Sequence, residues 1–268
     1  MLACAAQLWL SVGDLAGNRA AARRAIQEAA QAGAKLIVLP ELTVSGYVFT
    51  GRAEAGTLSE ELTGPTVAEW THLAAVLDIV IVGGIAERGA AGALYNTAVI
   101  IDPTGLRASY RKAHLWDLEK EIFIAGDEPA PVIETGIGRI AAMVCYDLEF
   151  PEWVRPVGLG GADILCVPTN WPLATRPEGE RPGEVIRAQS AASTNRLYVI
   201  AADRCGIERG VMWTGGSVII DPDGFPIAGQ SSADEPALLF AEVDVARARH
   251  KFLGERNDVL GDRRTDLY

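Results

Sequence analysis

The chain has 268 residues, of which 49% are hydrophobic, and it carries 24 basic against 35 acidic residues, a formal net charge of −11. This length and hydrophobic fraction indicate a globular chain with enough apolar side chains for a large core. The negative charge argues against nucleic acid and anionic membrane surfaces as partners and favours a small neutral or cationic substrate.

The cysteines are widely spaced, with no Cys-x-x-Cys pair and no adjacent histidine, and they are Cys4, Cys145, Cys166 and Cys205. This spacing indicates neither a zinc site nor a disulfide framework, so reduced thiols in a cytoplasmic protein are the simpler interpretation. The N-terminus is apolar but lacks a charged leader, and no run approaches the ~18 apolar residues of a membrane span. We therefore interpret it as a first strand.

Strands and helices are expected to alternate along the first half of the chain, which is typical of α/β layering. In chain order we expect a strand at 2–10, a helix at 18–32, a strand at 35–40, a helix at 66–77, a strand at 79–85 and a hairpin formed by 94–101 and 106–111. Gly33 closes the first helix, and the Asp-Pro-Thr-Gly sequence at 102–105 makes the turn of the hairpin.

The second half of the chain repeats motifs of the first half in the same order. Two pairs of segments match, 33–40 (GAKLIVLP) with 161–168 (GADILCVP) and 98–105 (AVIIDPTG) with 217–224 (SVIIDPDG). The repeats predict one domain spanning 1–268 that contains two similar halves, about 1–112 and 139–245, related by pseudo-twofold symmetry. Glu41 and Thr169 then occupy equivalent strand ends, and the junction of the halves is the expected cleft.

Glu41, Lys112 and Cys145 each come directly after a predicted strand, where a buried strand opens to the surface. Cys145 follows an apolar run at 140–144, and Pro151 suits the first turn of a helix, so the chain turns near this cysteine. Taken singly, the two charges would be solvated strand ends and the cysteine a buried packing residue. Taken together, the carboxylate can deprotonate the thiol while the ammonium lowers its pKa and stabilises an oxyanion.

Three blocks around these side chains resemble the signature motifs of the nitrilase, or carbon–nitrogen hydrolase, superfamily. The blocks are 39–41 (LPE) with Gly46 and Tyr47, 110–115 (YRKAHL), and 144–152 (VCYDLEFPE). Further similar segments are 187–188 (RA), 195–196 (NR), 204–206 (RCG) and the C-terminal 262–268 (DRRTDLY). The resemblance therefore covers nearly the whole chain.

The resemblance implies a four-layer αββα sandwich and a catalytic triad of Glu41, Lys112 and Cys145. In the implied mechanism, Glu41 takes the thiol proton as Cys145 attacks a carbonyl carbon, while Lys112 and the backbone N–H of Tyr146 stabilise the oxyanion. Ammonia or an amine leaves, and water hydrolyses the thioester without a metal or an organic cofactor. The superfamily commonly builds dimers, so we expect a homodimer or a higher even-numbered homo-oligomer.

A second glutamate often lies between the lysine and the cysteine in this superfamily. Glu119 and Glu121 are the two candidates here, and the Leu-Glu-Lys sequence favours Glu119; a solvated loop charge is the alternative for either one. The proline that usually precedes the glycine in this loop is replaced by Ala125, and a position that is often basic is Glu149. These departures leave the triad intact but weaken any inference of the substrate from relatives.

Five residues are candidates for contact with the substrate, namely Tyr47, His114, Tyr146, Asn170 and Trp171. His114 could instead form a rival Cys–His dyad or position its loop, and we favour the positioning role. A capped loop is the alternative for Asn170 and Trp171. Core or oligomer contact is the alternative for the aromatic residues, which include Trp213 as a further possible pocket wall.

The dipeptide after the cysteine bears on the type of hydrolase. Nitrilases of this superfamily usually have Trp-Glu there, whereas Tyr146-Asp147 resembles the amidase and carbamoylase branches. We therefore expect cleavage of a small carboxamide to a carboxylic acid and ammonia. The alternatives are an N-carbamoyl amine amidohydrolase, a nitrilase, and a catalytically silent binding module, which the intact triad argues against.

Overall fold

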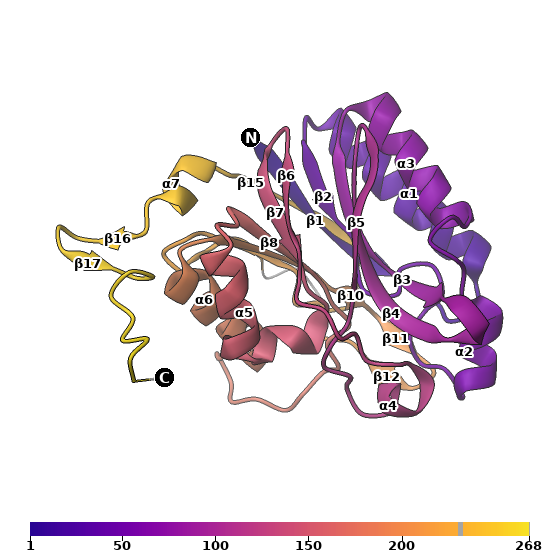
Figure 1. Cartoon of the computed structure of the whole chain (residues 1–268). Helices are drawn as coiled ribbons and strands as arrows, with labels where there is room; N and C mark the ends of the chain where they lie inside the picture. The colour runs from indigo at the N-terminus through magenta and orange to yellow at the C-terminus, as the bar shows by residue number, and fades with distance from the viewer. Residues whose placement is uncertain (230–232, 268) are drawn as a thin grey trace.

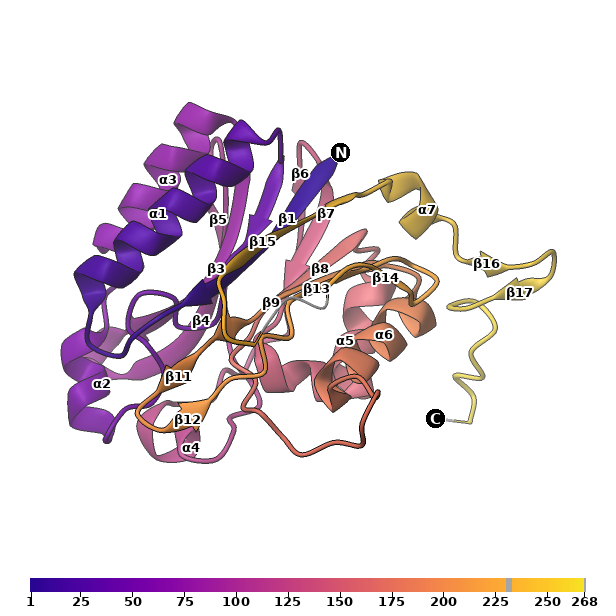
Figure 2. The same ribbon diagram turned by 180° about the vertical axis from the view of Figure 1, so that it is seen from behind.

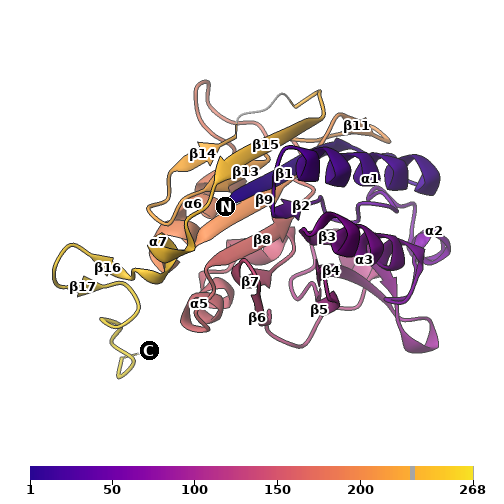
Figure 3. The same cartoon turned by 90° about the horizontal axis from the view of Figure 1, so that it is seen from above.

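Four layers make up the structure, in the order helices, sheet, sheet, helices (Figure 1, Figure 3). The computed structural model describes residues 1–229 and 233–267. Tyr268, the last residue of the C-terminal motif, lies outside the described residues. The two sheets pack face to face and the helices cover their outer faces, so the expected αββα sandwich is confirmed.

The first sheet takes strands from both ends of the chain. Its strands and covering helices are β1 (Leu2–Trp9), α1 (Leu15–Gln31), β2 (Leu36–Val38), α3 (Pro65–Leu77), β3 (Val80–Arg88), β4 (Leu94–Asp102), β5 (Gly105–Arg111), β10 (Arg204–Cys205) and β15 (Ala237–Glu242). The strand order is β10-β1-β2-β3-β4-β5, and β15 pairs with β1. Pairing is parallel from β1 to β3 and antiparallel from β3 to β5.

The second sheet has the same design. Its strands and covering helices are β6 (Val132–Thr135), β7 (Gly138–Ala142), α5 (Pro151–Leu159), β8 (Ile164–Pro168), α6 (Gly183–Asn195), β9 (Tyr198–Ala202), β13 (Val218–Ile220) and β14 (Pro226–Ala228). The strand order is β14-β13-β9-β8-β7-β6, with parallel pairing from β7 to β9 and antiparallel pairing on to β14.

The two sheets confirm the pseudo-symmetric halves. The repeated segments become β2 and β8, which are each the second of three parallel strands, and β4 and β13, which each begin the antiparallel part. The symmetry extends to the outermost strands, because β15 lies antiparallel to β1 as β6 lies antiparallel to β7. Glu41 and Thr169 therefore follow equivalent strands, as expected.

Alternation along the strands divides the apolar residues between two cores. In β1, Ala3 and Ala5 belong to the cluster between the sheets, whereas Cys4 and Ala6 belong to the cluster beneath α1 and α3. This is the two-residue period of a strand that is buried on both faces. Strands covered on both sides hold the loops at their ends in fixed positions.

Helix α1 begins three residues before the expected start at residue 18. Asp14 is its N-cap, and its side chain accepts a hydrogen bond from the backbone N–H of Gly17. Asn18 is buried inside the first turn, where its amide group donates to the carbonyl oxygens of Ser11 and Val44. The capping residue is thus an aspartate that the sequence-based boundary left outside the helix.

Short elements complete the chain (Figure 2). They are α2 (Arg52–Leu58), the 3-10 helix η1 (Ala90–Gly92), α4 (Glu119–Ile122), the 3-10 helix η2 (Cys145–Glu149), β11 (Ile207–Glu208), β12 (Val211–Met212), α7 (Val245–Arg249), β16 (Phe252–Leu253) and β17 (Asn257–Asp258). The segment from α7 onward, drawn in yellow, extends away from the layers. No helix among the described residues is long and apolar enough to cross a membrane.

Trp70 anchors α3 on the first sheet, and its removal tests this packing. Its side chain is fully buried against β3, where the ring lies so close to Gly83 that a Cβ at that glycine would be 2.7 Å away. We expect Trp70→Ala to lower the free energy of unfolding by about 3–5 kcal/mol, because it leaves a large cavity. Urea denaturation followed by far-UV circular dichroism measures the change.

Val76→Ala on the same helix is the matched control, because Val76 is 65% exposed. It should change the free energy of unfolding by no more than about 0.5 kcal/mol. Equal unfolding midpoints for the two variants would contradict the packing role of Trp70.

Candidate active site

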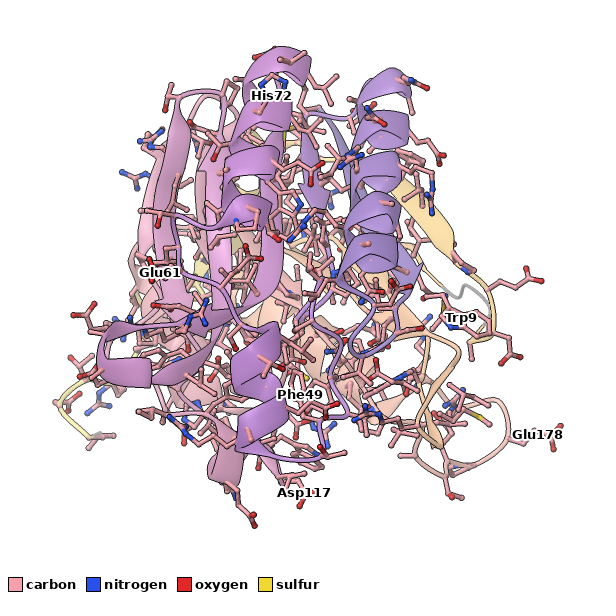
Figure 4. The ribbon with its side chains drawn as sticks, turned by 90° about the vertical axis from the view of Figure 1, so that its right-hand side faces the viewer. Trp9, Phe49, Glu61, His72, Asp117 and Glu178 are labelled. Carbon is pink, nitrogen blue, oxygen red and sulfur yellow. The ribbon has the colours of Figure 1, made fainter. Side chains whose placement is uncertain are left out.

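Three strand ends bring Glu41, Lys112 and Cys145 together between the two sheets. Glu41 follows β2, Lys112 follows β5 and Cys145 opens η2 after β7. Figure 4 shows Asp117, which lies between Lys112 and Glu119 in the sequence, at the opposite end of the molecule from His72 of α3. His72 is therefore remote from these strand ends.

A buried ammonium between two carboxylates forms the centre of the site. Lys112 Nζ lies 2.8 Å from Glu41 Oε1 and 2.8 Å from Glu119 Oε1, and the Lys112 and Glu41 side chains are both 0% exposed. Glu121 is exposed, so the structure favours Glu119 as the second glutamate. Burying three charges is costly unless they are paired and hydrogen-bonded, which this cluster achieves for the ammonium.

Glu41 is held from several sides, yet one of its oxygens is left open. Its Oε1 accepts hydrogen bonds from Lys112 and from Asn96 Nδ2 at 2.6 Å. Within residues 1–229 and 233–267, nothing donates a hydrogen bond to the buried Oε2. Its backbone lies against Gly84, where an added Cβ would be 2.6 Å from Glu41 Cα. A buried carboxylate oxygen without a donor is ready to take a proton.

The charges of the cluster adjust its proton affinities. Burial raises the pKa of Glu41 to about 7, and the Glu119 carboxylate adds to this while Lys112 opposes it. Burial alone would lower the pKa of Lys112, but the carboxylates of Glu119 and Glu41 outweigh it and hold that pKa well above its usual value. Near neutral pH, Lys112 is thus a fixed cation and Glu41 a group that can gain or lose a proton.

Cys145 sits in a strained turn beside the second sheet. Its backbone φ is +47°, in the left-handed region that non-glycine residues seldom adopt, and its Sγ lies 4.0 Å from the carbonyl oxygen of Asn170. Burial and the nearby Glu41 carboxylate raise the pKa of this thiol well above its usual value, against the pull of Lys112. The thiol is therefore protonated at rest and needs a base at the moment of attack.

The other three cysteines have packing positions. Cys4, Cys166 and Cys205 are free and buried, and burial raises the pKa of each thiol. Unlike Cys145, none of these three thiols has Glu41 or Lys112 among the groups that shift its pKa, so we interpret them as packing residues.

Tyr47 and Asn170 each donate a hydrogen bond to one of the two glutamates. The Tyr47 hydroxyl donates to Glu119 Oε1 at 2.6 Å, and Asn170 Nδ2 donates to the backbone carbonyl of Glu41 at 2.9 Å. Trp171 is buried next to Asn170, and its backbone N–H donates to Asp203. The expected substrate contacts of Tyr47, Asn170 and Trp171 stay predictions, with these positions as their basis.

His114 and Tyr146 lie in an aromatic cluster beside Cys145. His114 Nδ1 is 2.7 Å from Asp147 Oδ1, and its ring stacks on Phe150 with ring centroids 3.9 Å apart. These contacts favour the loop-positioning role of His114 over a Cys–His dyad. Tyr146 packs edge-on against Trp116 at a centroid distance of 4.9 Å and is partly exposed.

Sequence reasoning missed several polar residues that support the site. Asn96 was a visible signal, because it is an amide near the start of the mostly apolar strand β4. Glu208 gave no such signal: it forms a buried ion pair with Arg204 and accepts the backbone N–H groups of Tyr47 and Val48. Tyr47 and Val48 lie 161 and 160 residues away from Glu208 along the chain.

The αββα layers, with a buried cysteine in the turn after β7 and the Glu41–Lys112 ion pair close to it, fit a hydrolase that uses a thiol. The match with known proteins is more specific. Residues 2–251 match the carbon–nitrogen hydrolase family, and the chain belongs to that family.

Two relatives and one solved structure illustrate the similarity. A nitrilase of Pyrococcus abyssi is 35% identical over 252 residues, which cover 94% of this chain and 92% of the relative. An (R)-stereoselective amidase of a Pseudomonas species is 31% identical, with coverage of 95% and 90%. The amidase of Nesterenkonia sp. AN1 is 28% identical with a TM-score of 0.81, covering 100% of this chain and 98% of that one.

Structures of the Nesterenkonia amidase include amide compounds at the active site. One variant carries acrylamide added to the active-site cysteine, and another is a complex with butyramide.

The pH dependence of Cys145 alkylation tests the coupling between the thiol and Glu41. Because Glu41 must be ionised to take the thiol proton, the rate with iodoacetamide should rise with pH through about 7, the raised pKa of Glu41, and fall below it. Glu41→Gln should lose this rise and react about 10²-fold more slowly at pH 8, the scale expected for losing a general base. Mass spectrometry of the labelled peptide measures the rate.

Cys145→Ala gives the background from the three buried cysteines. A wild-type rate that rises only near pH 9, unchanged in Glu41→Gln, would show that Glu41 does not serve the thiol.

Proposed function

We propose that the protein is an amidase that hydrolyses a small uncharged carboxamide to a carboxylic acid and ammonia. The observation that carries this proposal is the buried Glu41–Lys112–Glu119 cluster beside the Cys145 thiol. It supplies a base with a pKa of about 7 and a permanent cation, the two functions that a resting thiol needs for acyl transfer.

The proposed reaction proceeds in two halves. Glu41 takes the proton of Cys145 as the sulfur attacks the amide carbon, and Lys112 with the backbone N–H of Tyr146 stabilises the oxyanion. Glu41 returns the proton to the amide nitrogen, so ammonia leaves and a thioester remains. Water then attacks the thioester, Glu41 takes its proton and passes it to the departing sulfur, and the acid is released.

Three observations favour an amide over a nitrile. An amide must expel ammonia, so the site needs an acid for the nitrogen, and a carboxyl group with a pKa of about 7 can act as both base and acid. Tyr146 and Asp147 follow the nucleophile, as expected for amidases. The (R)-stereoselective amidase and the Nesterenkonia amidase are amide-directed relatives by name.

The enclosure of the site supports a small substrate. Cys145 is only 7% exposed, and Glu41 and Lys112 are fully buried. A carboxylate-rich cluster repels anions, so a neutral acyl group is favoured over an anionic one.

We also propose that residues 1–268 act as one catalytic domain, because its halves, about 1–112 and 139–245, share the core between the sheets. The four free cysteines support a reducing, cytoplasmic location.

We further propose a homodimer or a higher even-numbered assembly. Apolar side chains are exposed on the outer helices of the second sheet and on the extended tail, namely Leu159, Ile186, Phe252, Leu253 and Leu267. Trp153 on α5 is partly buried and donates from Nε1 to the Tyr110 hydroxyl. The exposed Leu159 and Ile186 are the better candidates on α5 and α6.

A comparison of propionamide, propionitrile and an N-carbamoyl amine at equal concentrations tests the substrate class. We expect ammonia release to be fastest with propionamide, because the site can protonate the leaving nitrogen. Cys145→Ala should release no ammonia above background, and Lys112→Ala should lose about 10²-fold or more, as for removal of an oxyanion donor. Fastest turnover of the nitrile or of the carbamoyl compound would make the amidase assignment wrong.

Light scattering at micromolar concentration tests the assembly. We expect the mass of a dimer or an even multiple for the wild type, and a shift toward the monomer for Ile186→Asp, because a charge would enter an apolar contact. Val76→Asp is the matched control on the opposite helical layer and should leave the mass unchanged. A wild-type monomer would contradict the proposal.

A further inference from the structure

Asp147 is a buried carboxylate that joins the segments on either side of two proposed catalytic residues. Its side chain is 0% exposed. On the lysine segment, Oδ1 accepts the backbone N–H of His114 at 2.9 Å, and Oδ2 accepts the Tyr110 hydroxyl at 2.8 Å. Lys112 lies midway between these two donors in the sequence.

The same carboxylate closes the turn that contains Cys145. Oδ2 accepts the backbone N–H of Val144 at 3.2 Å, while the backbone N–H of Asp147 donates to the Val144 carbonyl at 3.0 Å. Cys145 is thus enclosed by a small ring of hydrogen bonds while its φ is +47°. Such a conformation persists only where its surroundings enforce it.

We propose that Asp147 is a positioning residue that fixes the distance between Lys112 and Cys145. Lys112 leaves the first sheet and Cys145 leaves the second, and the Asp147 carboxylate bridges the two segments with charge-assisted hydrogen bonds. The inference rests on the proposed function for the roles of Lys112 and Cys145.

Two further contacts make the bridge rigid. His114 Nδ1 lies 2.7 Å from Asp147 Oδ1, and the Tyr110 hydroxyl accepts a hydrogen bond from Trp153 Nε1 at 2.9 Å. Tyr110 belongs to β5 of the first sheet and Trp153 belongs to α5, which covers the second sheet. The bridge therefore connects the two halves of the sandwich. Both Asp147 oxygens are fully used, which leaves no acceptor free for a substrate.

An amide in place of this carboxylate cannot reproduce the bridge. Asparagine has one acceptor oxygen, so either the His114 side or the Tyr110 and Val144 side would face an NH₂ group. Misplacing a catalytic group by about 1 Å can cost ~10²-fold in rate. A displaced Lys112 would also stabilise the Cys145 thiolate less well.

Two rates test the inference in the full-length protein: turnover of propionamide and alkylation of Cys145 by iodoacetamide. For Asp147→Asn we expect kcat to fall about 10²-fold with KM changed by less than about threefold, because positioning and not binding is lost. Alkylation should slow by about 10-fold or more, because the thiolate has lost a well-placed cation. Its pH midpoint should rise, because a displaced Lys112 lowers the pKa of Glu41 less.

Asp163→Asn is the matched control. Asp163 is also a buried carboxylate; it accepts the backbone N–H of Arg139 at 2.9 Å and pairs with Arg249, at the other end of β7 and β8. It should change both rates by less than about twofold even where it lowers stability. Tyr110→Phe removes a single hydrogen-bond donor to Asp147, and it is the variant to use if Asp147→Asn does not fold. It should slow both rates by about 10-fold. This loss is smaller than the loss expected when all the hydrogen bonds of Asp147 are disturbed.

Wild-type values of kcat and alkylation rate in folded Asp147→Asn, or in Tyr110→Phe if the former does not fold, would overturn the inference. Equal losses in Asp163→Asn would also overturn it, because a general loss of stability would then suffice. A wild type that alkylates rapidly but releases no ammonia would contradict the proposed function alone, since the alkylation rates of the variants still report on Asp147.

Discussion

The structure depends on one constraint: an ammonium and two carboxylates share a space from which water is excluded. Lys112 can neutralise only one of Glu41 and Glu119, so burial and the second negative charge together raise the pKa of Glu41 to about 7. A carboxylate whose pKa rises on folding stabilises the fold below its unfolded pKa, and that contribution is lost as the pH rises through 7. Glu41 can therefore exchange a proton near neutral pH, but its burial lowers the free energy of unfolding at that pH, as is common for buried charged sites.

The strained backbone conformations near this cluster lie in the loops, whereas the strands that precede these loops are regular. Leu42, next to Glu41, has a φ of +49°, and Cys145 has a φ of +47°. The strands behind them are β2, which pairs in parallel with β1 and β3, and β7, which pairs in parallel with β8 and antiparallel with β6. Rigid strands can hold strained residues at their ends, because relieving the strain would require the strands to move and would disturb the packing of the core.

The parts that the sequence predicted are those with short-range signals. The repeated Gly-Ala-x-Leu/Ile segments predicted β2 and β8, and the position of Cys145 after an apolar run predicted its turn, although β7 itself ends at Ala142. The contacts of Asp147 with Tyr110 and of Glu208 with Tyr47 had no such signal, because 37 and 161 residues separate them. The hydrophobic periodicity of a short segment carries no information about contacts with distant segments, so only the folded chain reveals which polar side chains support the site.

The origin of the site residues in different halves has a consequence for synthesis on the ribosome. The chain emerges from its N-terminus, so Glu41 and Lys112 precede Cys145, and β15, which completes the first sheet, emerges after β14 of the second. Until both sheets dock, Cys145 is not held beside Glu41 and Lys112, whose charges act on its thiol in the folded chain. The proposed catalytic arrangement is thus the last property that the chain acquires as it folds.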